Sequence, residues 1–252
     1  LSRAANSDPH ISNLKLSYSE DSDNKQILFL HSSPEFPMKR LLASGTGSIY
    51  QIARVFRDNE RGKQHHPEFT LLEWYQVDLN HHDLMDEVDK LLVELCFASS
   101  ESISYRDCFY DQTGIDPMQC SDNELYEHAQ KAGFVCGNFE RNTLLDFLFS
   151  HRVTPTLGLH NPCFVYDYPQ QQAALAKLRF DDNASISIAE RFELFINGME
   201  IANGYHELNN SSELRTRFEQ DIEYCRSRSI PYGPIDENLL QTTDDLPDCA
   251  GV

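Results

Sequence analysis

The chain has 252 residues, a hydrophobic content of 40% and a formal net charge of -19 at pH 7. This composition suits a packed globular core, in one large or two small domains, and the acidic excess disfavours broad contact with a nucleic-acid backbone. The seven cysteines form no CxxC pair and have no metal-ligand spacing. We therefore expect free thiols in a reducing cytosol and no zinc site.

Neither a secretory leader nor a membrane span is expected. The opening LSRAANSDPH lacks a basic region followed by an apolar run, and no stretch approaches the ~20 apolar residues that cross a bilayer. These features predict a cytoplasmic protein without a membrane partner. The last residues, LPDCAGV, end without a polar tail, and the sequence reads as cut at both ends.

The first informative stretch in chain order is HSSPEFPMKRLLASG, residues 31–45. Ser33 is expected to cap a helix that has Pro34 at its first position and ends at Gly45, as helix start and stop preferences indicate. Glu35 falls in the first turn, where the helix dipole favours a carboxylate. The alternative is that Glu35 faces the amine of a ligand.

Residues 51–77 are typical of a β-hairpin with a polar loop. Because strand side chains alternate, Arg57 extends one face of the first arm, and Phe69 and Tyr75 share one face of the second. An arginine and a phenylalanine at the loop, with His65 between them, can hold a triphosphate by charge and an adenine by stacking. An ordinary surface hairpin with a charged turn is the alternative.

A predicted amphipathic helix follows the hairpin, with an apolar face and an acidic outer face. The adjacent pairs His65-His66 and His81-His82 invite a metal-binding interpretation. Neighbouring residues on a strand or in a loop point apart, so we expect solvated loop histidines instead. Farther on, Ser121 is expected to cap a helix, and Asn142 is expected to cap the next one.

The second informative stretch is AERFELFINGMEIANGYHEL, residues 189–208, which predicts two strands joined by the turn Asn197-Gly198. The second strand carries Glu200, Asn203 and Glu207 among apolar residues. Strict alternation puts Asn203 and Glu207 on one face and Glu200 on the other. All three converge only if the strand is bulged, and Asn203-Gly204 is the candidate position. The alternative is an edge strand with a solvated face.

Taken together, these stretches resemble the class II aminoacyl-tRNA synthetases. FRDNERGKQHHPEF fits their second motif, in which an Arg begins the loop and a His or Arg stands four residues before a Phe. HSSPEFPMKRLL resembles the amino-acid-binding segment of lysyl-tRNA synthetases, and MEIANGYHELN resembles their metal- and substrate-binding strand. The resemblance covers nearly the whole chain. It implies an α+β fold, with a class II synthetase-like antiparallel sheet flanked by helices, in one catalytic domain over residues 1–252 whose first and third motifs lie outside the chain.

The resemblance implies an adenylate-forming, amide-bond-forming ligase that uses ATP and Mg²⁺. Arg57 would be the catalytic residue, holding the substrate carboxylate and the α-phosphate as negative charge builds up. His65 would reach the outer phosphates, Phe69 would stack on adenine, and Glu200 would bind Mg²⁺. Asn59 stands where the family usually has Glu, and it would accept from the adenine amino group without a charge. The other ATP contacts implied by the resemblance are Asp58, His66 and Ile201.

The same resemblance implies a lysine-like substrate with two amino groups. Glu35, Glu207 and Tyr75 would receive these amino groups, because a dication needs acidic and hydroxyl partners. Asn203 would hydrogen-bond the substrate carboxylate. Ser33 and Pro34 complete the implied substrate-binding set.

Within the family, LLEWY, FVYDYP and LPDCAGV resemble the short lysyl-tRNA synthetase paralogues that modify translation elongation factor P. That likeness implies (R)-β-lysine as the amino acid, a lysine side chain of elongation factor P as the acceptor, no direct tRNA contact, and a homodimer when full length. Two alternatives stay open. One is a lysyl-tRNA synthetase catalytic domain, and the other is a non-catalytic paralogue that binds an amino acid or adenylate as a regulatory module.

Overall fold

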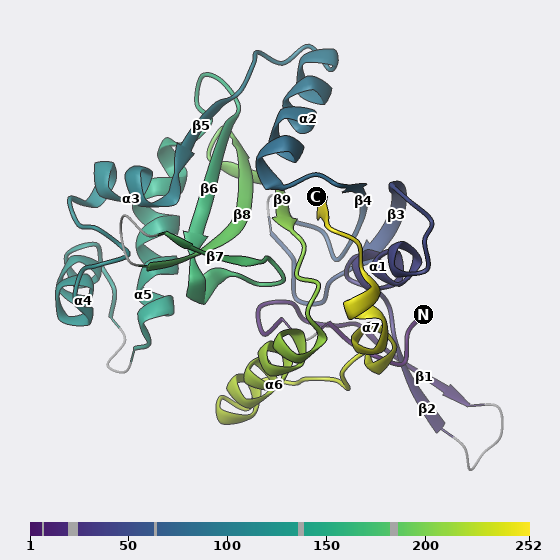
Figure 1. The fold of residues 1–252 in the computed structure, drawn as a ribbon. Helices are drawn as coiled ribbons and strands as arrows, with labels where there is room; N and C mark the ends of the chain where they lie inside the picture. Colours follow the sequence, from purple (N-terminus) through teal and green to yellow (C-terminus); the bar gives the residue numbers. More distant parts are fainter. Residues whose placement is uncertain (7, 20–24, 63–64, 136–138, 182–185) are drawn as a thin grey trace. The chain divides into compact units, whose positions relative to one another are not determined.

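The computed structural model describes residues 1–6, 8–19, 25–62, 65–135, 139–181 and 186–252 (Figure 1). The chain divides into two compact units. Unit 1 consists of Leu1–Asp78 and Leu208–Cys249, and unit 2 consists of Leu79–Glu207 and Ala250–Val252.

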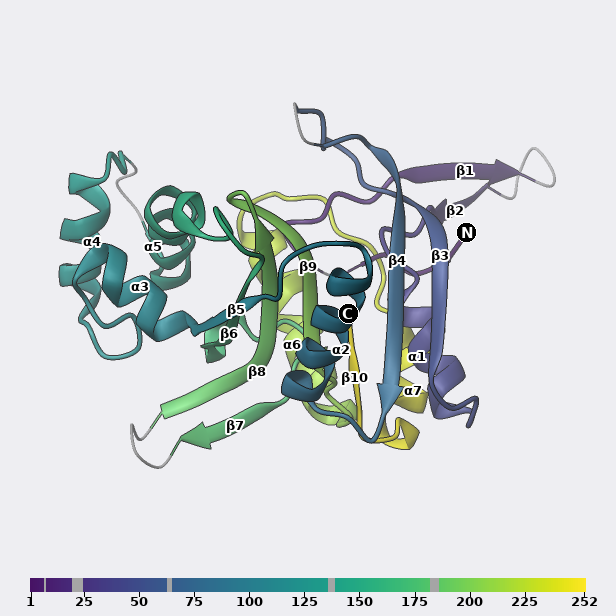
Figure 2. The ribbon, with the colours of Figure 1, turned by 90° about the horizontal axis from the view of Figure 1, so that it is seen from above.

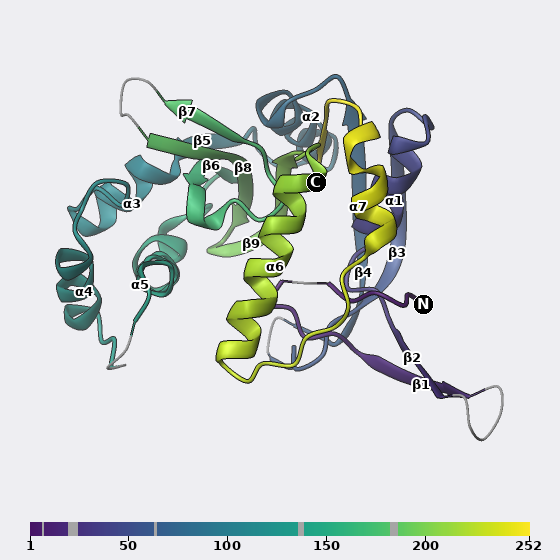
Figure 3. The same ribbon diagram turned by 60° about the horizontal axis from the view of Figure 1, so that its bottom comes forward.

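Unit 1 is built on two antiparallel strand pairs with helices beside them. Its strands are β1 (Lys15–Ser19), β2 (Lys25–Phe29), β3 (Ile49–Phe56) and β4 (Glu68–Val77), and its helices are α1 (Glu35–Ala43), α6 (Ser211–Ser227) and α7 (Glu237–Thr242), with a 3-10 turn at Thr243–Asp245. Strand β1 pairs with β2, and β3 pairs with β4, as the predicted hairpin requires. Figure 2 shows β3 and β4 running side by side, and Figure 3 shows α1 beside α7.

The core of unit 1 lies between α1 and the hairpin. Met38 and Leu42 of α1 pack in one buried cluster with Tyr75 of β4, Leu246 and Cys249. These two α1 residues are four positions apart and therefore share one face of the helix. The packing fixes α1 against β4, which sets the position of the α1 N-terminus relative to the polar residues of that strand.

Helix α1 begins at Glu35, one residue later than predicted, with Pro34 as its N-cap residue. The Ser33 hydroxyl oxygen nevertheless accepts the Glu35 backbone N–H at 2.9 Å, so it satisfies one of the free donors of the first turn. The helix stops where expected, because Gly45 has a φ of 88°. This left-handed conformation suits glycine at a helix end.

Unit 2 contains a mixed sheet with helices packed against it. Its strands are β5 (Glu101–Ser104), β6 (Cys163–Pro169), β7 (Leu178–Asp181), β8 (Ile186–Ile196), β9 (Met199–His206) and the last two residues of β10 (Cys249–Gly251). Their order is β10-β9-β8-β6-β5, with β7 also paired to β8. Strands β5 and β6 are parallel, and the other pairs are antiparallel. This mixture of a largely antiparallel sheet and separate helices confirms the predicted α+β class.

The helices of unit 2 are α2 (His81–Glu94), α3 (Tyr105–Thr113), α4 (Asp122–Lys131) and α5 (Arg141–Leu148), with a π-helical turn at Phe149–Val153 and 3-10 turns at Thr154–Thr156 and Gln170–Gln172. A ring cluster joins this helical layer to the sheet. Tyr105 stacks on Phe149 with ring centroids 4.8 Å apart, and it packs against Tyr168 of β6 at 4.9 Å. Contacts of this kind stabilise beyond the area they bury, so β6 is firmly supported from one side.

Helix starts in unit 2 follow the expected capping rules in part. Ser121 accepts the Glu124 backbone N–H, so its predicted role as a cap is confirmed. The prediction for Asn142 is wrong, because α5 begins at Arg141 with Glu140 at the N-cap position. In the described part of the chain, no helix is both long enough and apolar enough to cross a membrane.

Candidate active site

The β3–β4 hairpin places its functional residues by register. Val55 pairs with Phe69, and Gln51 pairs with Glu73. Directly paired residues in an antiparallel ladder lie on the same face, so the face that carries Val55 also carries Phe69, Glu73 and Tyr75. Of these, Val55, Glu73 and Tyr75 are buried. One face of the hairpin is therefore directed into unit 1, and it carries most of the polar groups that the sequence singled out.

Arg57 and Phe69 meet at the open end of this face. The guanidinium lies 5.2 Å from the centre of the Phe69 ring, and its Nε donates to the Ser32 carbonyl oxygen at 3.2 Å. The Arg57 backbone N–H also donates to the Pro67 carbonyl oxygen, which extends the ladder beyond β3. A charged fork beside an aromatic face suits a nucleotide, since one binds phosphate oxygens and the other stacks on a base. The described residues thus fit ATP at this place.

Most of the described residues of the β3–β4 loop are exposed to solvent. Asp58 and Asn59 are exposed, and Asn59 has a φ of 61°, a conformation that asparagine tolerates better than most residues. His65 and His66 are exposed loop residues, as predicted, and they line an open pocket of about 530 Å³ that also includes Phe56. Phe56 belongs to the face opposite to Val55 and Phe69. The pocket places His65 with Phe56, and the predicted contact of His65 with phosphate stays a prediction.

A buried carboxylate that the sequence analysis had not selected lies at the centre of the substrate-binding candidates in unit 1. Glu73 is 6% exposed. Its two oxygens accept from the Ser33 hydroxyl at 2.6 Å and from the Tyr75 hydroxyl at 2.7 Å. Glu35 stands nearby on α1, where Lys39 binds its carboxylate at 2.6 Å. Ser33, Glu35 and Tyr75 are therefore gathered around Glu73, with Pro34 buried at the start of α1.

The environment of Glu73 raises the pKa of its carboxyl group from 4.5 to about 7. Burial is the largest cause, and the negative charge of Glu35 adds to it, while the hydrogen bonds from Ser33 and Tyr75 and the charge of Lys39 act in the opposite direction. One sequence feature could have identified Glu73, because it is an acidic residue within the apolar segment LLEWY, on the inward face of a predicted strand. A buried acid of this kind needs a partner, because an isolated charge is costly to bury.

The second set of candidates lies in unit 2 on β9, and a β-bulge brings it together. Leu194 pairs with Ala202, but Phe195 pairs with Glu200, so Ile201 is the extra residue on β9. Glu200 consequently faces the same side as Asn203, although simple alternation separates them. The prediction of a bulge is confirmed. Its predicted position at Asn203-Gly204 is wrong, because Gly204 keeps its regular pairing with Phe192 and packs against the Phe192 ring.

Close packing explains why Gly204 stays in register. A Cβ atom at this position would lie 2.3 Å from the Phe192 ring, and this distance is far below van der Waals contact. Phe192 is fully buried and pairs with Gly204 across the β8–β9 ladder. Glycine therefore serves a steric purpose here, and the bulge forms three residues earlier.

Asn203 is held by a partly buried arginine that the sequence did not reveal. Arg191 Nε donates to Asn203 Oδ1 at 3.1 Å, and Arg191 Nη1 donates to the Gln172 carbonyl oxygen at 2.7 Å. Since the amide oxygen of Asn203 is occupied by this bond, its NH₂ group is directed as a donor. A donor is what the predicted contact with a substrate carboxylate requires.

Arg191 is itself fixed by Glu193 and Tyr168. It binds the Glu193 carboxylate and lies 4.6 Å from the Tyr168 ring, whose hydroxyl donates to Glu193 at 2.7 Å. Burial alone would lower the pKa of the guanidinium, but the Glu193 carboxylate and neighbouring acidic groups raise it. Arg191 thus stays charged, and its network acts as a rigid support for Asn203.

The remaining unit 2 candidates differ in exposure. Glu200 and Ile201 are exposed, whereas Glu207 is only 1% exposed and its backbone bridges to Ala176. Within the ranges described, Glu200 belongs to no group of three metal-binding side chains. A single carboxylate still suits Mg²⁺, which is commonly bound by one or two carboxylates together with substrate phosphates.

The prediction of solvated loop histidines is wrong for His81. His81 and His82 are the first two residues of α2, and His81 is 2% exposed beside Asp167. Asn80 caps this helix through a reciprocal arrangement with Asp83, which draws the histidines into the first turn. His82 is exposed, as expected.

Comparison with known proteins decides the family. The model of the tRNA synthetases class II (D, K and N) matches residues 15–233. The chain belongs to the class II tRNA synthetase family. Similar class II relatives are the elongation factor P (R)-beta-lysine ligases of Vibrio atlanticus, 43% identical over 258 residues, and Haemophilus ducreyi, 42% identical over 256 residues. These alignments cover 100% of this chain and 79% and 77% of the two relatives.

The ligase of the same printed name from Vibrio parahaemolyticus is 46% identical over 230 residues, covering 89% of this chain and 70% of the relative. The matched relatives are therefore ligases within the class II family. Enzymes of this family are ATP-dependent and form adenylates. This agrees with the Arg57–Phe69 arrangement, in which a guanidinium lies beside an aromatic ring.

Proposed function

We propose that this class II family member activates (R)-β-lysine as an acyl-adenylate with ATP and transfers it to a lysine side chain of translation elongation factor P. The observation that carries the proposal is the polar cluster of unit 1, in which Ser33, Glu35, Glu73 and Tyr75 converge. A substrate with two ammonium groups complements two carboxylates placed close together. The names of the ligases to which the chain is similar support the amino acid and the acceptor.

In the first step, the substrate carboxylate attacks the α-phosphate, and pyrophosphate leaves. Arg57 neutralises charge that develops at the α-phosphate, and Phe69 provides the stacking face for adenine. Asn203 donates its NH₂ group to the substrate carboxylate, with Arg191 holding the amide in that orientation. Glu200 is the proposed ligand of Mg²⁺, which reduces the negative charge of the phosphates. Asp58, Asn59, His65, His66 and Ile201 remain proposed ATP contacts.

The two amino groups of the substrate are proposed to bind to carboxylates that differ in protonation state. A pKa near 7 leaves Glu73 partly protonated at neutral pH. An approaching ammonium group lowers that pKa, because the opposite charge favours the ionised form. Glu35 and Glu207 are the further acidic partners, while Ser33, Pro34 and Tyr75 shape the pocket wall. In the second step, the amine of the acceptor lysine attacks the adenylate carbonyl and AMP leaves.

We further propose that units 1 and 2 act as one catalytic domain, that the protein works in the cytoplasm, and that it forms a homodimer. The net charge of -19 supports a protein acceptor over direct binding of tRNA. Mg²⁺ and ATP are the proposed cofactor and co-substrate.

Pyrophosphate exchange with the complete protein tests the proposal. We expect exchange that depends on (R)-β-lysine, followed by labelling of elongation factor P. Strong exchange with α-lysine and transfer to tRNA, without exchange on (R)-β-lysine, would identify a lysyl-tRNA synthetase. Binding of a lysyl-adenylate analogue without any exchange would identify a regulatory module. Glu207→Gln is expected to impair use of diamino substrates more than it impairs ATP binding, and equal losses would contradict its role.

A further inference from the structure

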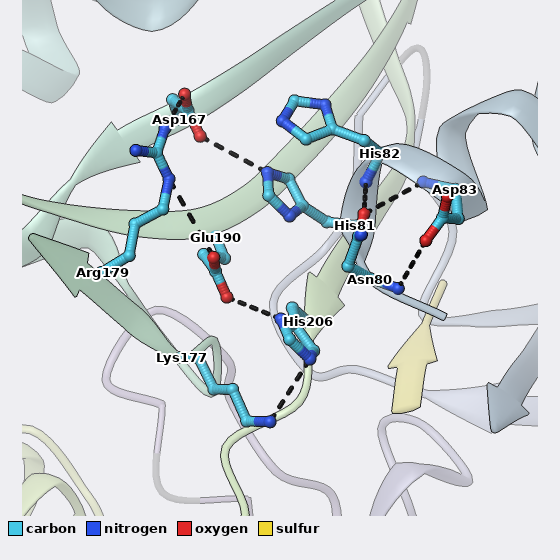
Figure 4. A network of polar contacts seen from close by, with 9 residues as sticks. All are labelled: Asn80, His81, His82, Asp83, Asp167, Lys177, Arg179, Glu190 and His206. Atoms are coloured by element: carbon cyan, nitrogen blue, oxygen red, sulfur yellow. Dashed lines mark hydrogen bonds and ion pairs between the residues drawn. The ribbon is translucent and has the colours of Figure 1, made fainter. Parts of the chain in front are cut away.

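A polar network outside the proposed ligase residues lies at the start of α2 in unit 2 (Figure 4). His81 is almost fully buried there, and its Nδ1 atom has no hydrogen-bond partner among the residues that the structure describes. Its Nε2 atom lies 3.4 Å from Asp167 Oδ1, whereas good N–H···O bonds measure about 2.7 to 3.2 Å. The imidazole is therefore buried with one nitrogen unpaired and the other only loosely paired.

No protonation state of His81 satisfies this environment. With the proton on Nε2, the lone pair of Nδ1 stays buried without a donor. With the proton on Nδ1, a buried N–H lacks an acceptor, and the lone pair of Nε2 faces a carboxylate oxygen. A doubly protonated ring leaves the Nδ1–H unpaired as well. Buried polar groups left in this way are costly, which calls for a further group between His81 and Asp167.

The separation of the two facing atoms matches a shared metal ion. Zinc binds imidazole nitrogen at about 2.0–2.1 Å and carboxylate oxygen at about 2.0–2.2 Å, in tetrahedral geometry. Two such ligand atoms around one ion are about 3.3 to 3.5 Å apart, by the tetrahedral angle. The 3.4 Å between His81 Nε2 and Asp167 Oδ1 falls within this range.

His82 supplies a third donor from the same helical turn. One ligand atom each from His81, His82 and Asp167 lies within 4.8 Å of the others. The His82 ring lies beside the His81 ring, with centroids 4.0 Å apart, and its edge packs on Tyr166 at 5.2 Å. To bind the same ion, His82 would rotate about its side-chain bonds toward His81 Nε2 and Asp167 Oδ1. The cap at Asn80 holds both residues in the first turn of α2.

Asp167 is presented by the backbone and held from behind. It is the single β6 residue opposite Glu190 and Arg191 at a bulge of β8, and it has a φ of 61°, so its side chain is re-aimed from the regular pleat. Arg179 on β7 binds Oδ2, which leaves Oδ1 directed at His81. Outer partners of this kind orient the carboxylate that binds a metal.

The surrounding charges allow one cation without favouring it strongly. Arg179 and the N-terminus of α2 oppose a positive ion, whereas Asp167 and Glu190 favour one. His206 is engaged by Glu190 at 2.6 Å and by Lys177 at 3.3 Å, and it therefore serves as part of the outer network. In the described part of the chain, His81, His82 and Asp167 are the side chains placed to share an ion.

We propose that His81, His82 and Asp167 bind one divalent transition-metal ion of the Zn²⁺ class, with water at the fourth position. Two imidazoles and one carboxylate are donors typical of zinc and of neighbouring ions such as Co²⁺. The ion links the first turn of α2 to Asp167 of β6, where the β6–β8 register shifts. This site is separate from the Mg²⁺ proposed at Glu200, because nitrogen donors suit transition metals better than Mg²⁺.

Titration of the purified chain with Zn²⁺ alone, followed by calorimetry, tests the site. We expect one ion per chain and a rise in the thermal midpoint with Zn²⁺ concentration, because an ion that binds the folded form stabilises it. His82→Asn and Asp167→Asn are each expected to weaken binding at least tenfold. His82 is chosen because it is exposed, and Asp167→Asn is chosen because it keeps the shape of the side chain. Both variants should therefore fold, which circular dichroism without metal can confirm.

The matched control is the double variant His65→Ala/His66→Ala, which removes the other adjacent histidine pair. Zn²⁺ affinity is expected to stay within twofold of that of the original chain. Co²⁺ absorption should show tetrahedral nitrogen and oxygen coordination without a thiolate band. Absence of saturable binding, unchanged affinity in His82→Asn and Asp167→Asn, loss of affinity in the control pair, or a thiolate band would each overturn the assignment.

Discussion

Two buried carboxylates on strands, Glu73 in unit 1 and Glu193 in unit 2, are held in different ways. Glu193 binds the Arg191 guanidinium and accepts from the Tyr168 hydroxyl. Glu73 accepts from the neutral hydroxyls of Ser33 and Tyr75, and its pKa is about 7. Glu193 is committed to an internal ion pair and supports Asn203. Glu73 is suited to receive an external cation, which the proposed diamino substrate supplies.

The largest effect is expected from removing the internal cation. Arg191→Met leaves Glu193 buried without its counter-charge, and breaking a buried pair from one side costs about 3–5 kcal/mol. Chemical denaturation measures this loss. The exposed pair Arg215–Glu237 provides the control, because Arg215→Met removes only a solvent-screened contact and should leave the free energy of unfolding nearly unchanged.

A double variant, Arg191→Met with Glu193→Met, sharpens the same comparison. Removing both charges should recover most of the stability lost in Arg191→Met, since no uncompensated charge remains. It should not recover the binding of the substrate carboxylate, because Asn203 loses its orienting partner. Full recovery of KM for the amino acid in the double variant would contradict the positioning role of Arg191.

Glu73→Gln should produce the next largest effect, on activity. We expect kcat/KM for the diamino substrate to fall about 100-fold, or about 2.7 kcal/mol, because a charge-assisted contact with an ammonium group is lost. ATP affinity should be retained. Pyrophosphate exchange measures kcat/KM, and nucleotide titration measures ATP affinity. The control is Glu94→Gln, on the exposed surface of α2. An equal loss of ATP binding would show that Glu73 acts on the whole fold.

The pH dependence of stability provides a third test. The folded pKa of Glu73, about 7, lies above the unfolded value of 4.5, so its contribution is fully present below pH 4.5 and is lost as the pH rises through 7. Each pKa unit corresponds to about 1.4 kcal/mol, so the loss is up to about 3 kcal/mol. Denaturation of Glu73→Gln at pH 5 and pH 8 should show a smaller decline than in the original chain. An unchanged decline would mean that Glu73 is already ionised.

The smallest effect on activity is expected at Asp221 on α6. Unlike Glu73 and Glu193, this acid is only partly buried. Its pKa is raised from 3.8 to about 7, mainly by burial and also by the charge of Asp8, while the charge of Arg217 acts in the opposite direction. Asp221→Asn should therefore stabilise the protein at pH 8 and have little effect at pH 4. Thermal melts at the two pH values check the sign. Activity on the diamino substrate should stay unchanged, in contrast to Glu73→Gln.

Part of the proposed site followed from local sequence alone. The motif positions of Arg57 and Phe69, the serine near the start of α1 and the turn at Asn197-Gly198 depend on residues close together in the chain. Strand alternation then places Phe69 and Tyr75 on one face without knowledge of the fold. The need for a bulge in β9 also followed from alternation, since Glu200 and Asn203 cannot otherwise share a face.

Tertiary structure decided the rest, because it depends on register and burial between distant segments. The bulge at Ile201 became apparent from the pairing of β8 with β9, and a shift of one residue changes which face a side chain occupies. Glu73 acquires its pKa from burial and from Ser33, Glu35 and Lys39, which lie far from it in the chain. Arg191 reaches Asn203 across a strand pair. His81 lies 86 residues before Asp167, so no local pattern could place the two atoms together.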